Sequence, residues 1–92
     1  MRAIWKYEPP APGHTVTHAV PIGAKYLTTS QATGCVYLEV DPRREKRGSL
    51  ILASVATGRQ FKMSGARYLG LHHDGAFVWH IYGNLRSAER KS

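Results

Sequence analysis

The sequence predicts an all-β protein, a single small antiparallel sandwich or barrel of about seven short strands. Apolar and polar residues alternate with a period of two over much of the chain, which is typical of strands that bury one face. Turn signals such as Thr33-Gly34 and Thr57-Gly58 separate the alternating runs at intervals of about 8–12 residues. No segment shows the longer period of an amphipathic helix.

The first half of the chain divides into four strands. We expect these strands at residues 2–8, 15–20, 25–32 and 35–41. A cluster of prolines ends the first strand, because proline cannot donate a hydrogen bond to a strand ladder. In the fourth strand, Val36, Leu38 and Val40 are expected to face the core. Glu39 and Asp41 then fall on the opposite, solvent-facing side.

The second half begins with the most apolar segment of the chain. Residues 49–56 are apolar almost throughout, which predicts a central strand covered on both faces. Residues 59–66 are polar and contain glycine, so we expect a loop with a short edge segment there. Residues 66–73 and 76–82 are predicted to form the last two strands.

The 92 residues are enough for one domain and one core. We place a single β domain at 1–85 and a polar basic tail at 86–92, with a short C-terminal helix within 84–92 as the alternative to a frayed tail. Cys35 is the one cysteine, which excludes an intrachain disulfide and a cysteine zinc site. Its apolar neighbours predict a small buried side chain and not a nucleophile.

The last hairpin, LGLHHDGAFVWHIYG, holds three histidines and resembles a metal or catalytic site. Asp74-Gly75 predicts a two-residue type I′ turn, which fixes the register of the two strands. In that register His73 and His80 share a face but lie roughly 13 Å apart. Zinc needs nitrogen ligands about 2 Å away, so no metal site is expected here.

The same register leaves apolar side chains on both faces of the hairpin. Leu69, Leu71, Val78 and His80 share one face and are our candidates for a protein interface. Either a loop of this chain or another chain covers them, and a self-complementary homodimer is one way to do so.

The chain is strongly basic, with 13 Lys and Arg against 6 Asp and Glu, which gives a net charge of +7. Such an excess attracts polyanions, although it also keeps a small domain soluble. The candidate residues for binding nucleic acid or another anion are Arg43, Arg44, Lys46, Arg47, Arg59, Lys62 and Arg67. The alternative is that these residues form solvated loops.

Enzyme signatures are lacking, and we do not expect an enzyme or a cofactor. The chain contains no P-loop, GxGxxG or GxSxG motif. Glu39 and Asp41 are the one pair of carboxylates with a shared strand face, and a solvent-facing role is the simpler interpretation. No apolar run is long enough to span a bilayer, so a soluble protein is expected.

Several short motifs occur in order along residues 3–82. They are Ile4-Trp-Lys-Tyr-Glu8, Pro21-x-Gly23-Ala-Lys25, Val40-Asp41, Thr57-Gly58, Tyr68-Leu-Gly70 and Asp74-Gly-Ala-Phe-Val-Trp-His80. This ordered set resembles a small domain of unknown function from tailed bacteriophages and prophages. The resemblance implies expression in the cytoplasm of a bacterial host and transfers no catalytic residue. The loop 43–47 and the tail 86–92 depart from the family pattern.

We therefore expect a non-catalytic phage accessory protein that engages a host macromolecule, as a host-takeover factor or anti-defence inhibitor. The alternative is a module that binds nucleic acid or an anionic nucleotide through the basic loop and tail. A minor structural component of the virion is the second alternative. The expected partner is a host protein, or a nucleic acid or nucleotide, and no membrane is involved.

Overall fold

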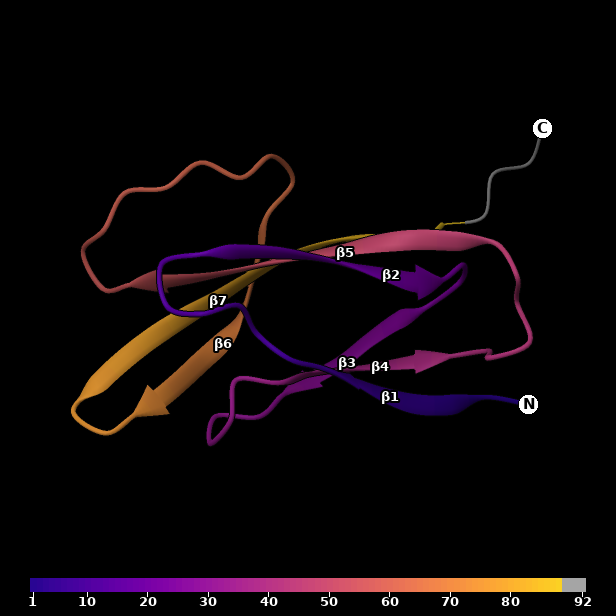
Figure 1. The fold of residues 1–92 in the computed structure, drawn as a ribbon, viewed down its shortest axis with the longest axis horizontal. Coiled ribbons are helices and arrows are strands. Elements are labelled where there is room, and N and C mark those ends of the chain that lie inside the picture. The colour runs from indigo at the N-terminus through magenta and orange to yellow at the C-terminus, as the bar shows by residue number, and fades with distance from the viewer. Residues whose placement is uncertain (89–92) are drawn as a thin grey trace.

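The computed structural model describes residues 1–88 and shows two antiparallel sheets that enclose one core (Figure 1). The strands are β1 (Ala3–Tyr7), β2 (Thr15–Pro21), β3 (Lys25–Thr29), β4 (Val36–Val40), β5 (Arg47–Ala56), β6 (Arg67–Asp74) and β7 (Phe77–Arg86). One sheet has three strands in the order β1-β4-β3, and the other has four in the order β2-β5-β7-β6. The predicted all-β fold with about seven antiparallel strands is confirmed. The described part of the chain contains no helix that is long and apolar enough to cross a membrane.

The core lies between the two sheets and draws on both of them. Leu38 of the three-stranded sheet belongs to the same buried cluster as Leu50, Leu52 and Ile81 of the four-stranded sheet. Complete burial of such side chains stabilises the fold by about 1.5–3 kcal/mol each. Residues of β4 alternate between buried and half-buried, which confirms that its valines and leucine face inward.

β5 is a long central strand of the larger sheet, beside β7, as its apolar sequence predicts. It pairs with β2 on one side and with β7 on the other, so its backbone hydrogen bonds are satisfied along both edges. Leu50 and Leu52 point into the core. Ile51 and Val55 fall on the opposite face and are half-buried.

The sheets are joined along one side and open along the other. At the joined side, Tyr26 Oη donates a hydrogen bond of 3.1 Å to the carbonyl oxygen of Leu69, which links β3 to β6. At the open side, the edges β1 and β2 belong to different sheets and do not pair. There the rings of Tyr7 and His18 lie 5.3 Å apart, and His18 Nε2 donates to the Glu8 carbonyl oxygen at 3.0 Å.

The turn of the last hairpin differs from the expected one. Gly75 and Ala76 form the loop, and Asp74 pairs with Phe77. Among the described residues only glycines have positive φ, and Gly75 has a φ of 59°. A type I′ turn needs positive φ at both central residues, whereas type II′ needs it at the first alone, so Gly75 directs a II′ turn. The pairing therefore moves by two positions, which leaves the predicted faces unchanged next to the turn.

A β-bulge changes the faces further along β6. The pairing shifts between Tyr68 and Gly70, where Gly70 has a φ of 145°. Leu69 consequently packs against the core, while Tyr68 turns to the outer face of the four-stranded sheet beside His80. The expected grouping of Leu69 with the outer-face residues was wrong for this reason.

The C-terminal part of the domain is more regular than its sequence predicts. Arg86, assigned to the polar tail, is the last residue of β7, and Ser87 is buried. The alternative helix within 84–92 is wrong for residues 84–86, which are strand. The remainder of the expected tail, 89–92, lies outside the described residues.

Tyr7 carries an unusual hydroxyl group at the open side of the sandwich. Its Oη is buried and lacks a hydrogen-bond partner in the described structure. Burial raises the pKa of this hydroxyl above its ordinary value of 10.0, and the positive charge of Arg47 opposes that rise in part. A buried hydroxyl without a partner costs stability.

We expect Tyr7→Phe to raise the free energy of unfolding by about 0.5–1 kcal/mol at pH 7, because it removes the unpaired hydroxyl. The unfolded chain ionises this tyrosine at lower pH than the folded chain does. Ionisation of Tyr7 therefore leaves the folding stability unchanged below pH 10.0 and lowers it as the pH rises through the folded pKa, a loss that Tyr7→Phe does not show. Urea unfolding of both proteins from pH 7 to pH 11 measures this, and a variant that is less stable at pH 7 would contradict it.

Candidate functional site

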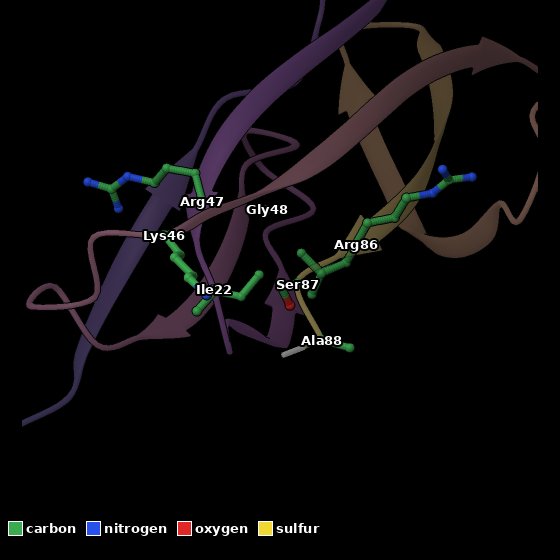
Figure 2. A pocket seen from close by; sticks show the side chains of 8 residues that line it. Ile22, Lys46, Arg47, Gly48, Arg86, Ser87 and Ala88 are labelled. Atoms are coloured by element: carbon green, nitrogen blue, oxygen red, sulfur yellow. The ribbon is translucent and has the colours of Figure 1, made fainter. Parts of the chain in front are cut away.

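Cationic side chains gather around a hollow at the end of the sandwich where β5 begins. The hollow is lined by Ile22, Lys46, Arg47, Gly48, Leu85, Arg86, Ser87 and Ala88 (Figure 2). We call Lys46, Arg47 and Arg86 the basic end. Lys46 precedes β5, Arg47 begins it and Arg86 completes β7, so β5 brings together cations that are distant in the sequence.

Backbone contacts hold the basic end in place. Gly48 has no side chain, and a Cβ there would overlap the carbonyl oxygen of Arg86. The N–H of Gly23 donates to the Ser87 carbonyl oxygen at 2.6 Å, and the N–H of Ile22 donates to the Lys46 carbonyl oxygen at 2.9 Å. The C-terminal end of β7 is thereby fixed against the turn after β2.

A buried side chain adds a further anchor to the same end. Ser87 Oγ donates a hydrogen bond of 2.7 Å to the carbonyl oxygen of Ala24, and both residues are buried. Removing one partner of a buried hydrogen bond leaves the other without compensation for its lost hydration. Arg86, next to Ser87, is therefore presented from a well-defined backbone.

The three cations of the basic end point in different directions. Figure 2 shows the guanidinium groups of Arg47 and Arg86 extending to opposite sides of the hollow, with the Lys46 side chain between them near Ile22. Within residues 1–88, no carboxylate forms an ion pair with any of the three. A ligand that spans this end of the sandwich would meet all three positive charges.

The neighbouring loop is ordered by one aspartate. Asp41 Oδ1 accepts hydrogen bonds from the Arg43 backbone N–H at 3.1 Å and from Arg43 Nε at 3.2 Å. The side-chain hydrogen bond from Arg43, followed by the backbone one, lowers the pKa of Asp41 from its usual 3.8, and the carboxylate raises the pKa of Arg43 in return. Arg43 is thus partly neutralised within its own loop.

The structure does not unite all the predicted anion-binding residues. Arg43, Arg44, Lys46 and Arg47 lie at or beside the basic end, and Arg44 makes a contact of its own. The loop 57–66, which carries Arg59 and Lys62, follows the opposite end of β5 (Figure 1). Arg67 starts β6 and lines a separate hollow with Lys25, Tyr26 and Leu50.

Arg86 joins the basic end although the sequence analysis placed it in the tail. The signal that extends β7 is the two-residue alternation of Ile81, Gly83 and Leu85, which continues past the predicted end of the strand at 82. Gly83 interrupts this apolar pattern. A side chain at this position would overlap Leu69 and crowd Leu52, so glycine leaves the space that these two leucines fill.

The predicted protein interface is covered in part by the chain itself. His80 is hydrogen-bonded to Tyr68 Oη at 3.0 Å and to Thr57 Oγ1 at 2.7 Å. The ring of Phe61 lies 4.5 Å from the ring of Tyr82, which places the loop 57–66 over this outer face. Of the two expected ways to cover this face, a loop of the same chain or a second chain, the structure shows the loop.

Leu71 and Val78 share the outer face with His80, as expected, whereas Leu69 packs against the core. Both Leu71 and Val78 are half-buried, and Phe77 beside the turn, on the opposite face of the hairpin, is 67 % exposed. The remaining apolar surface of this hairpin is therefore concentrated near its tip.

The histidines and carboxylates are held separately from one another. Leu71 lies opposite His80 in the strand pairing, whereas Leu69 was expected there. His73 is therefore two positions from the residue opposite His80, and the two histidines are roughly 7 Å apart along β6, closer than predicted. In residues 1–88, His, Cys, Asp and Glu form no group of three or more that could hold a metal ion. Glu39 pairs with Arg2 at 2.6 Å and Asp41 with Arg43 at 3.2 Å, so each carboxylate has its own arginine.

The fold and the basic end define a small two-sheet β sandwich with three cations at one end that form no ion pair within residues 1–88. The chain belongs to the family described as "Domain of unknown function (DUF7352)", whose model matches residues 1–92. This match confirms that the chain is a domain of unknown function. Neither a curated protein nor a solved structure matches the chain.

The Asp41–Arg43 contact predicts a measurable acid titration. We expect the carboxyl carbon of Asp41 to titrate below pH 3.8 in carbon-13 NMR, because Arg43 stabilises its ionised form. The stability from this contact is present above pH 3.8 and is lost as the pH falls through the folded pKa.

Arg43→Gln serves as the comparison for this titration. It removes the guanidinium and keeps the backbone N–H bond, so the pKa of Asp41 should move part of the way back to its usual value. An unchanged pKa would show that the side-chain contact does not form in solution.

Proposed function

We propose that this chain is a non-catalytic binding module whose basic end holds nucleic acid. The observation that carries this proposal is the set of three cations, Lys46, Arg47 and Arg86, around one hollow without an ion pair in the described structure. Phosphate contacts supply most of the affinity of sequence-independent nucleic-acid binding. The net charge of +7 adds long-range attraction for the same ligand.

The divergence of the cations supports an extended polyanion over a single nucleotide. A lone phosphate is best held by donors that converge on it, as in a bidentate arginine contact. Arg47 and Arg86 extend to opposite sides of the hollow in Figure 2, which suits successive phosphates along a strand. A rigid backbone beneath these side chains reduces the entropy lost on binding.

A second candidate function is binding of a host protein by a phage accessory factor in the bacterial cytoplasm. The tip of the β6–β7 hairpin supports it, because Phe77 is 67 % exposed there and lies on the same face of the hairpin as half-buried Trp79. The sequence resemblance to a phage and prophage domain supplies the setting, as a host-takeover or anti-defence factor. Phe77→Ala should abolish such binding, whereas Arg47→Ala should leave it intact.

We expect the double variant Arg47→Ala, Arg86→Ala to bind a labelled duplex of about 20 base pairs more weakly than the wild type. In fluorescence anisotropy across about 50 to 200 mM salt, each lost phosphate contact reduces the slope of log K against log salt by about 0.9. The double variant should therefore lose close to two such increments.

Arg59→Ala, Lys62→Ala is the matched control, since it removes the same net charge from the loop at the other end of β5. The control should retain nearly all of the wild-type affinity. Equal losses in both double variants would show general charge attraction and no site. Absence of binding at about 50 mM salt, or affinity that does not change with salt, would reject the proposed function.

A further inference from the structure

β1 is an edge strand with an unusually open flank. It pairs with β4 on one side, and the described structure places no strand on its other side. Ile4 is 66 % exposed and Trp5 is 38 % exposed. Trp5 lies opposite Leu38, which is completely buried, so its indole faces the core side at the open edge of the sandwich.

Natural proteins usually protect such an edge. Prolines, bulges, inward-pointing charges or a covering segment prevent a second chain from pairing with the unused N–H and C=O groups. β1, with the sequence AIWKY, contains no proline, no bulge and no inward-pointing charge. Its one charged residue, Lys6, is on the outward face. Pro9 and Pro10 follow the strand and leave its five residues available.

We propose that β1 pairs with β1 of a second copy of this chain. The two strands run antiparallel about a two-fold axis at Trp5, which joins the two three-stranded sheets into one continuous sheet. Each partly exposed Trp5 then lies opposite its symmetry mate at the open side of the sandwich. Edge-to-edge addition of this kind takes its affinity from backbone hydrogen bonds and its register from side chains.

The charges along β1 select this register. Arg2, Lys6 and Glu8 alternate onto one face with Ile4, and directly opposed side chains in an antiparallel pair point to the same face. An axis at Trp5 places Arg2 opposite Glu8 of the other copy and overlaps all of Ala3–Tyr7.

The neighbouring registers are less favourable. An axis at Ile4 opposes Arg2 to Lys6 of the other copy, twice, and an axis at Lys6 opposes the two lysines to each other. Like charges directly opposite one another destabilise a strand pair. Each alternative also shortens the overlap of the strands.

The contacts already made by these residues are compatible with pairing. Glu8 uses its carbonyl oxygen for His18, at 3.0 Å, and its side chain is in the exposed part of the chain. Arg2 Nε contacts Glu39 Oε1 at 2.6 Å, and its Nη2 donates to the carbonyl oxygens of Gly23 and Glu39, both at 3.4 Å. A guanidinium has five N–H donors, so the two on Nη1 can reach a second carboxylate while these contacts remain.

Two substitutions at one exposed position test both the pairing and its register. In the proposed dimer Ile4 faces Lys6 of the other copy, so Ile4→Glu creates two attractive contacts and Ile4→Lys creates two repulsive ones. Sedimentation velocity of the full chain from about 5 to 200 µM gives the dissociation constants. We expect Ile4→Glu to bind itself at least about tenfold more tightly than Ile4→Lys, with the wild type between them.

Leu27→Lys is the matched control, because Leu27 is 42 % exposed on β3 at the far edge of the same sheet. It should self-associate like the wild type, and circular dichroism melts confirm that each variant is folded. Equal weakening by Ile4→Glu and Ile4→Lys would overturn the proposed register. The sign of the new charge would then have no effect, so position 4 would not face Lys6 of the other copy. A wild type that is monomeric at every concentration would overturn the dimer itself.

Discussion

The pairing of β5 along both of its edges is the constraint on which the rest of the structure depends. Leu50 and Leu52 can seal the core only because β2 and β7 satisfy the backbone of β5 on either side. An unpaired backbone group in this interior would cost free energy comparable to a lost hydrogen bond. The same pairing sets Arg47 and Arg86 at one end of the sheet and the loop 57–66 beside the other.

The basic end follows from that constraint and from the lack of a side chain at Gly48. The backbone of Arg86 and Ser87 approaches Gly48 so closely that any Cβ would overlap it. Ser87 is then buried against Ala24, and β7 ends at a fixed place beside the start of β5. Cations that the sequence separates by about forty residues thereby come to share one surface. Their charge had already suggested that the basic loop and the tail bind one ligand, and the strand order gives the reason why Arg47 and Arg86 share a surface.

Features governed by local alternation were predictable from the sequence, and features governed by backbone irregularity were not. The inward faces of β4 and the central place of β5 follow from periods and apolar content, and both are confirmed. The hairpin register was wrong because Gly75 alone adopts positive φ, so the turn contains Ala76 and not Asp74. Gly70 within a strand was the available signal for the bulge that moves Leu69 into the core.

The position of the basic end relative to the β1 edge has a consequence for how a dimer would bind. Ala3 pairs with Val40, which immediately precedes the loop 41–46, so β1 begins at the same end of the sandwich as Lys46 and Arg47. A two-fold axis at Trp5 reverses the second copy and carries its basic end to the opposite end of the joined sheet. The two basic ends of a dimer then face away from each other and cannot share one short duplex. Nucleic acid would accordingly bind once per chain, with an affinity for short duplexes that does not depend on self-association through β1.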